Sequence, residues 1–466
     1  MLNFLGLDAR RLLKRILAIA GLLLLGRMAG YGRFQIAMGV VACRLLGIRS
    51  LSSVFWVTLV FLFTARPFLG MVPTHWPETE LMARYGESDL ADWGVRYFGL
   101  LARLGLAYVV FQVLMKLPLR QRFLVLHLVM LVLILTCGAY LRSGPVVAAI
   151  GMYFLISFCW YFPVLLYLLA DNQRLSPRRF LELYVVPFWE TSPNPQPILG
   201  LEHQPELEDA LLSRCIKLSF FFAAFIGGGN LIHSLLLNVP FYGLKLPLLW
   251  NPIPDLEVTG LSTSVFLVYP RWKIALSIFW AGVHRVTGYM ALGTLIECCR
   301  LLLCYDVPRR FIVPWKVTSF ADFYNCIMPY YVVALNRIYI QPIYTALRHR
   351  GWGRKWGFEM AVLVAIFAGN LTIHILRDVE LVIILGGSEY LWLSLITELP
   401  YCLLLYLLLR FMTLPKRAIP WVPWPARITF FCFLYSLIIL MRMGGLFVSP
   451  LTRWSFAMAT FFGTGL

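Results

Sequence analysis

Long apolar runs recur along the whole chain and alternate with short polar or basic segments. Many of the runs approach the roughly 20 residues that a helix needs to cross the hydrocarbon core of a bilayer. The pattern predicts helices near residues 15–31, 35–48, 53–72, 97–117, 122–142, 145–170, 216–238, 263–284, 286–304, 324–346, 357–377, 391–412 and 426–444. Because some runs could be re-entrant or interfacial, we expect roughly ten to thirteen spans. The expected fold class is an all-α polytopic membrane protein.

The composition agrees with this interpretation. The 466 residues are 60% hydrophobic and 14% charged, with a mean hydropathy of +0.75. One soluble core cannot bury that much apolar surface. A soluble domain with a single anchor is excluded, because bilayer-length runs continue from end to end.

The formal net charge of +18 is better explained by membrane topology than by binding to a polyanion. Lysines and arginines gather in short loops between apolar runs, as the positive-inside rule predicts. They include Arg10, Arg11, Lys14 and Arg15, then Lys116, Arg120 and Arg122, and finally Arg348, Arg350, Arg354 and Lys355. No basic block with interleaved aromatic and polar residues stands outside the runs, so no nucleic-acid partner is expected.

The acidic loop His75–Trp93 gives the expected orientation. It carries five carboxylates and one arginine, so we expect it to face outward and the N-terminus to be cytoplasmic. The first apolar run is not expected to be a cleaved signal, because it lacks a small-residue cleavage pattern.

Three consecutive segments are predicted. Residues 1–170 hold the N-terminal helices, 171–215 form a cytoplasmic or interfacial connection, and 216–466 hold the C-terminal helices. The prolines of the connection forbid one continuous helix. At its start, the stretch "SPRRFLELYVVPFW" suits a short helix in the headgroup layer.

The ten cysteines lie mostly inside apolar runs and show no paired short spacing. Adjacent cysteines such as Cys298 and Cys299 do not chelate a metal in the usual way. We therefore expect the cysteines to pack in the core, without a metal site or a disulfide framework.

Ionisable and amide side chains inside apolar runs are the candidates for chemistry. Each is costly in lipid, so each is expected to be paired or functional. They are His127, His233, His284 with Arg285, Glu297, Asp322 with Asn325, His374 with Asn370, and Glu398. A lone histidine in such a run is more often a packing residue. We expect Glu297 and Glu398 to pair with buried basic groups.

His374 is the best placed of these groups. On a helix, Asn370 lies four residues earlier and on the same face. The small pair Ala368-Gly369 allows another helix or a ligand to approach closely. An imidazole can take the proton of an alcohol, as acyl transfer to a hydroxyl requires. The structural alternative is a hydrogen bond between helices.

Five short motifs follow one another within about ninety residues. They are Thr287-Gly288-Tyr289, Val313-Pro314-Trp315, Ser319 to Asn325, Tyr339-Ile340-Gln341-Pro342, and Ile373-His374. In order and spacing they resemble the membrane-bound O-acyltransferase (MBOAT) family, especially the bacterial branch that acylates alginate, cellulose and teichoic acids. The similar core covers about residues 280–410. Thr287 is expected to open a helix, and Ser319 or Asp322 to cap the next one.

The resemblance implies a bundle of tilted helices around a chamber, in the bacterial inner membrane. It implies transfer of an acyl group, most simply acetyl, to a hydroxyl of an envelope polysaccharide or lipid-linked acceptor. The donor would be an acyl thioester, either acyl-CoA or an acyl carrier, and no tightly bound cofactor is expected. His374 would be the general base, and Asn370 and Asn325 would orient the substrates. The expected substrate-binding residues are Asp322, Tyr324 and His284.

Two departures from the family pattern leave an alternative open. The stretch "NCIMPYY" stands where the family has its first histidine, and Trp-His-Gly is reduced to Ile-His-Ile around His374. His284 could replace the lost histidine or could be structural. The alternative function is a catalytically inactive scaffold that binds other envelope or membrane-complex subunits. A transporter is less consistent with the sequence, because paired broken helices are not evident in two halves.

Overall fold

A computed structural model describes a large part of the chain, in segments. These are residues 9–47, 104–118, 121–129, 165–166, 168–170, 174–184, 196–197, 205–242, 244–245, 252–254, 256, 265–306, 316–370, 389–415, 419, 421–441 and 450–462. The predicted run 53–72 and His374 lie outside them.

The chain forms two compact units, each made of separate stretches of sequence. The first unit comprises Met1–Met71, Trp189–Tyr331 and Leu408–Leu466, and the second comprises Val72–Phe188 and Val332–Leu407. This division differs from the three consecutive segments predicted from the sequence, because long-range packing groups distant helices together.

The described part is mainly helical, which confirms the predicted all-α class. In the first unit the helices are α1 (Ala9–Ala29), α2 (Tyr31–Leu45), α9 (Pro205–Leu237), α11 (Val265–Val268), α12 (Arg271–Leu302), α13 (Phe320–Ile327), α19 (Trp424–Leu440) and α20 (Pro450–Phe462). The strands β1 (Gln196–Pro197) and β2 (Tyr305–Asp306) form a short antiparallel pair. In its register, Gln196 faces Asp306 and Pro197 faces Tyr305.

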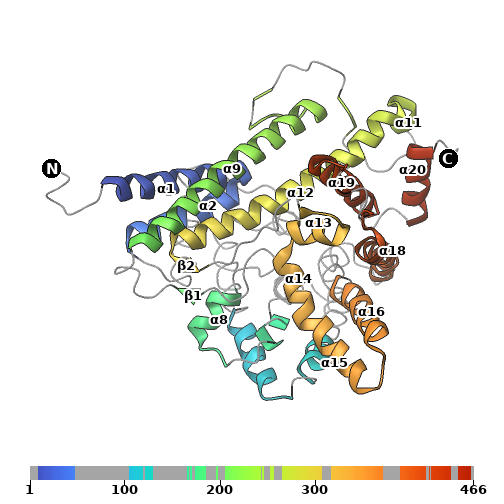
Figure 1. Ribbon diagram of the computed structural model, residues 1–466, viewed down its shortest axis with the longest axis horizontal. Helices are drawn as coiled ribbons and strands as arrows, with labels where there is room; N and C mark the ends of the chain where they lie inside the picture. Colours follow the sequence, from blue (N-terminus) through green and yellow to red (C-terminus); the bar gives the residue numbers. More distant parts are fainter. Residues whose placement is uncertain are drawn as a thin grey trace, which may run out of the picture. The chain divides into compact units, whose positions relative to one another are not determined.

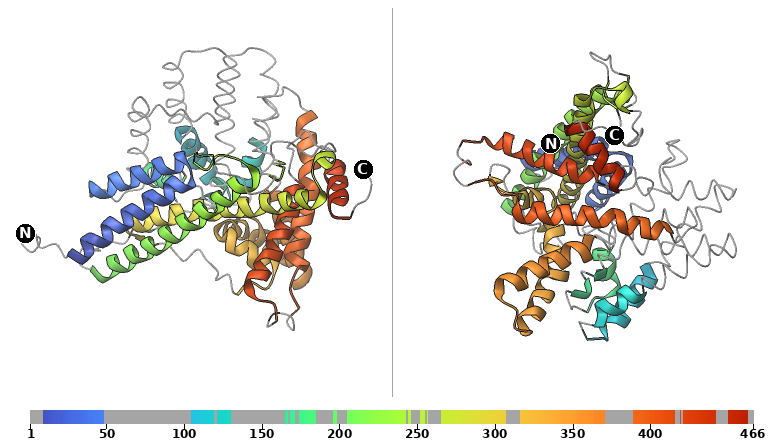
Figure 2. Two further views of the ribbon diagram at one scale, coloured as in Figure 1. Left: turned by 90° about the horizontal axis from the view of Figure 1, so that it is seen from above. Right: turned by 90° about the vertical axis from the view of Figure 1, so that its right-hand side faces the viewer.

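The long helix α12 connects two packed groups within the first unit. Its C-terminal part packs with α1, α2 and α9 around a shared apolar core that includes Leu22, Cys215 and Leu295 (Figures 1 and 2). Its N-terminal part packs against α19, where Ser436 Oγ donates a hydrogen bond to Phe279 O at 3.1 Å. A Cβ at Gly282 would lie 2.8 Å from Ser436 Cα, so the small residue permits this close approach.

Two predicted spans, 263–284 and 286–304, are wrong as separate elements, because α12 runs through both. Thr287 therefore does not open a helix. It lies in the middle of α12, where its hydroxyl donates to Val283 O at 2.9 Å. The helix ends at Leu302, and Cys304 beyond it adopts a left-handed conformation with φ 64°.

The helix α9 begins at Pro205, inside the connection predicted for residues 171–215. Proline is favoured at the first helical position, and Glu206 and Glu208 follow it in the first turn, where carboxylates are favourable. Within the part of the chain that is described, one helix, from Glu206 to Leu237, is long and apolar enough to cross a membrane. Shorter apolar helices cover Ile36–Leu45, Leu104–Met115 and Trp424–Leu440.

The predicted run 324–346 is not one regular span. The helix α13 ends at Ile327, and α14 (Pro329–Leu335) starts after Met328 and continues from the first unit into the second. A π-helical stretch, η5 (Asn336–Ile340), then leads into α15 (Gln341–His349). A second one, η6 (Ile366–Asn370), follows α16 (Arg354–Ala365). The helix α18 (Glu389–Phe411) contains Pro400.

Elsewhere in the second unit, α8 (Pro177–Tyr184) confirms the short helix predicted there and packs on the helix Leu104–Met115. The ring of Phe180 lies 5.3 Å from that of Tyr108 and 5.2 Å from that of Phe111. Arg122 is buried, and its guanidinium donates to the carbonyl oxygens of Leu117 at 2.7 Å and Met115 at 3.2 Å.

Candidate functional site

The start of α13 is held by a reciprocal capping box, in which both of the residues expected to cap it, Ser319 and Asp322, take part. Ser319 Oγ accepts the N–H of Asp322 at 3.0 Å, while Asp322 Oδ2 accepts the N–H of Ser319 at 3.0 Å. The same carboxylate oxygen also accepts the N–H of Thr318 at 3.0 Å and its hydroxyl at 2.9 Å. Asp322 therefore satisfies backbone donors at the helix start.

This capping box also fixes where α13 joins the rest of the first unit. The N–H of Phe320 donates to Met412 O at 2.9 Å, and the N–H of Leu414 donates to Thr318 O at 2.9 Å. The segment before α13 is thus paired with the residues that follow α18. Loss of the cap would loosen both segments.

Replacing Asp322 with alanine is expected to lower the free energy of unfolding by about 1–2 kcal/mol, because the cap is removed. Thermal unfolding followed with a thiol-reactive dye measures this, since Cys326 is buried in the same helix. Ser319→Ala is the matched comparison and should cost less, because Ser319 Oγ accepts one of these hydrogen bonds whereas Asp322 Oδ2 accepts three. Unchanged unfolding of Asp322→Ala would contradict the capping role.

The other predicted residues of the first unit lie in α13 and α12. Tyr324 is buried, and Asn325 beside it is partly exposed. The ring of His284 stacks on that of His233 from α9, with 4.2 Å between the ring centroids. The indole N–H of Trp280 donates to His233 Nδ1 at 3.0 Å. His284 thus joins a layered aromatic contact between two helices, which favours the structural role.

In the second unit, Gly369 brings η6 against the end of α14 and against η5. A Cβ placed on Gly369 would lie 2.4 Å from Leu335 Cδ2 and 3.4 Å from Tyr339 Cε2. Only glycine allows this approach without a shift of the neighbouring side chains. The segment η6, which ends four residues before His374 in the sequence, therefore touches Tyr339, the first residue of Tyr339-Ile340-Gln341-Pro342.

A pocket of about 590 Å³ lies between η5 and α15 on one side and the start of α16 on the other. Its lining combines amide, phenol, apolar and basic side chains. These are Asn336, Ile340, Gln341, Tyr344, Arg354, Lys355 and Phe358. The rings of Tyr344 and Phe358 meet edge to face, with 6.1 Å between their centroids.

The pocket carries positive charge and no carboxylate. Arg354 and Lys355 open α16 and are exposed, and neither forms an ion pair with a described acidic residue. Cations are unfavourable in the first turn of a helix, where the backbone N–H groups already create positive potential. The N-cap residue, Gly353, supplies no side-chain acceptor. The arrangement is therefore suited to an anion.

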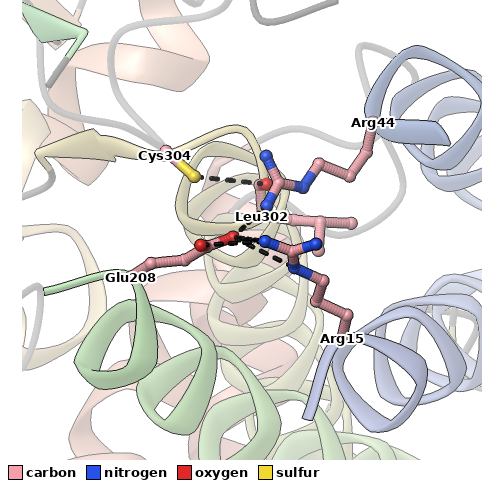
Figure 3. Close-up of polar contacts among 5 residues, drawn as sticks. All are labelled: Arg15, Arg44, Glu208, Leu302 and Cys304. Atoms are coloured by element: carbon pink, nitrogen blue, oxygen red, sulfur yellow. Dashed lines mark hydrogen bonds and ion pairs between the residues drawn. The ribbon is translucent and has the colours of Figure 1, made fainter. Parts of the chain in front are cut away.

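A buried ionic cluster joins α1, α2 and α9, and the sequence pattern did not predict it. Glu208 accepts from Arg15 Nη2 at 2.9 and 3.0 Å and also pairs with Arg44 (Figure 3). The thiol of Cys304 donates to Leu302 O at 3.9 Å, and both residues are drawn beside the cluster in Figure 3. The sequence does contain one relevant signal. Acidic residues follow Pro205, and acidic residues in a first turn are typical of a helix start.

Other buried groups agree with the sequence analysis. Eight of the ten cysteines lie in the described segments, and all eight are buried, as expected for packing residues. Glu297 is 3% exposed and pairs with Arg214, which confirms a basic partner. Glu398 is 1% exposed.

Of the three residues predicted to be catalytic, the structure describes Asn325 and the backbone of Asn370 but not His374. Asn325 belongs to the first unit, whereas the backbone of Asn370 ends η6 in the second unit. His374 follows η6 outside the described residues. No protein-family model matches the chain, and no curated protein or solved structure is significantly similar to it.

Proposed function

We propose that the chain is a membrane-embedded O-acyltransferase. It transfers an acyl group, most simply acetyl, from a thioester to a hydroxyl of an envelope polysaccharide or a lipid-linked acceptor. The observation that carries this proposal is the contact of Gly369 with Leu335 and Tyr339. It brings the end of the described segment that precedes His374 in the sequence against Tyr339, the first residue of the Tyr339-Ile340-Gln341-Pro342 motif.

The π-helical geometry of these two segments adds support. Such turns are rare in helices and occur frequently at functional sites, because they redirect the side chains that follow. In this chain η5 overlaps the Tyr339-Ile340-Gln341-Pro342 motif, and η6 ends four residues before His374. Both η5 and η6 therefore depart from regular α-helix close to residues that the proposed reaction uses.

In the proposed reaction, His374 accepts the proton of the acceptor hydroxyl as the oxygen attacks the thioester carbonyl carbon. The new C–O bond forms, the C–S bond breaks, and the departing thiolate takes the proton from the imidazolium. Asn370 would orient the substrates. The products are the ester and the free thiol.

The proposal places the chain in the bacterial inner membrane with a cytoplasmic N-terminus. The composition, the basic loops and the candidate span in α9 support this location. Large apolar side chains on α9 are exposed, such as Phe221 at 64% and Ile232 at 47%. Lipid would cover such side chains in a membrane protein.

The test is the amount of alkali-releasable acyl ester in the cell envelope of the native host. Cells that lack the chain should lose the ester, and cells supplied with it again should recover the ester. Unchanged ester in the deletion strain would contradict the proposal. That result would favour the alternative, a scaffold subunit whose partners would then be isolated with the purified chain.

A further inference from the structure

The lining of the pocket beside α16 indicates the chemistry of its ligand. Ile340, Tyr344 and Phe358 give it an apolar wall, while Asn336 and Gln341 contribute amide groups that can donate hydrogen bonds. Arg354 and Lys355 contribute two positive charges. A ligand that satisfies all of them has a compact, multiply charged anionic end and an organic part.

The position of the cations argues for a phosphate group as that anionic end. The first N–H groups of α16 have no side-chain cap, and the N-terminus of a helix of this length is a favourable place for a phosphate. Arginine and lysine both bind phosphate oxygens through charged hydrogen bonds. The pocket thus combines two kinds of donor that phosphate sites use.

The surface around the pocket is basic and aromatic. Arg348, His349 and Arg350 precede Arg354 closely in the sequence, and Trp352 and Trp356 are 41% and 70% exposed. Arg348 Nη1 donates to Trp352 O at 2.7 Å, which stabilises this turn. Exposed tryptophans with nearby cations are typical of segments at a membrane interface, where phosphate headgroups are concentrated.

We propose that this pocket binds a phosphate monoester, with Arg354 and Lys355 as the charge partners of the phosphate and the apolar wall in contact with its organic part. The phosphate can come from a lipid headgroup or from a soluble ester. Binding can be measured without turnover, so the proposal does not rest on acyl transfer.

The test uses the full chain, purified in an uncharged maltoside detergent, and calorimetric or thermophoretic titration with three probes. Dioctanoyl phosphatidic acid carries a phosphate and two short chains, glycerol 3-phosphate carries the phosphate alone, and dioctanoylglycerol carries the chains alone. At least one phosphate probe should bind, and dioctanoylglycerol should bind at least about tenfold more weakly. Tighter binding of phosphatidic acid would identify a lipid source, and equal binding of the two phosphates a soluble source.

The variants distinguish phosphate binding in the pocket from nonspecific attraction of phosphate to the basic surface. Lys355→Gln and Arg354→Gln should each weaken phosphate binding by about tenfold, because each removes a charged hydrogen bond. Lys355→Arg, which keeps the charge, should retain most of the affinity. Arg350→Gln is the matched control, since Arg350 is exposed, lies in the same basic segment and does not line the pocket. Equal losses at positions 350 and 355, or no binding of either phosphate by the wild type, would overturn the proposal.

Discussion

Replacing His374 with alanine is expected to reduce ester formation by about 100-fold or more, because general-base catalysis typically contributes at least that factor. The alanine side chain cannot accept the proton of the acceptor hydroxyl, and the oxygen would have to attack in its weakly nucleophilic protonated form. The measurement is alkali-releasable acyl ester in the envelope, at matched abundance of wild type and variant.

The control is His349→Ala, which makes the same change at an exposed position at the end of α15. It should leave ester formation unchanged. Asn370→Ala should lower ester formation less than His374→Ala, since an orienting amide does not transfer the proton. Full ester formation by a folded His374→Ala protein would refute the catalytic role and leave the imidazole as a packing group between helices.

Local features of the fold could be predicted from the sequence because their causes are local. The Ser319 to Asp322 spacing places both capping partners at one helix start, and the structure confirms their hydrogen bonds. The stretch "SPRRFLELYVVPFW", which mixes arginines with aromatic residues, likewise predicts a short helix, and the structure shows it as α8. In both cases the residues that determine the element lie within it.

Features that depend on distant partners were missed. The sequence predicted two separate spans, 263–284 and 286–304, on either side of Arg285. In the structure α12 continues, and the His284 ring stacks on His233 of another helix. Such a contact shields a polar ring within a continuous helix, but its partner lies far away in the chain.

The pocket was missed for a similar reason. Arg354 and Lys355 fit the positive-inside pattern, so their sequence context suggested only orientation. They line one pocket with Asn336 and Gln341 only because α16 packs against η5 and α15. Side chains of ordinary composition become a candidate binding site only when two helical segments meet.

Replacing Glu208 with glutamine is expected to lower the free energy of unfolding by about 3 kcal/mol, because breaking a buried ion pair leaves its partner charge uncompensated. The side chains of Glu208 and Arg44 are each 10% exposed, whereas that of Arg15 is 38% exposed. Arg15 can therefore reach water after the change, and most of the cost comes from Arg44.

The neighbouring ion pair provides the control. Asp209 pairs with Lys14, and their side chains are 26% and 20% exposed. An ion pair with this access to water contributes little to stability, because solvent screens it. Asp209→Asn should therefore destabilise the protein much less than Glu208→Gln. Thermal unfolding with a thiol-reactive dye compares the two variants, since the core around this cluster contains the buried thiols of Cys43, Cys215 and Cys298.

A double variant tests whether the cost comes from the unpaired cation. Glu208→Leu with Arg44→Leu removes the carboxylate and the buried guanidinium together, and exchange of a buried ion pair for apolar groups is often neutral or stabilising. The double variant should therefore unfold at a higher temperature than Glu208→Gln. If it is as unstable as the single variant, Arg44 must be required in its own right. The cluster would then hold α1, α2 and α9 together through Arg44 contacts that do not depend on the charge of Glu208.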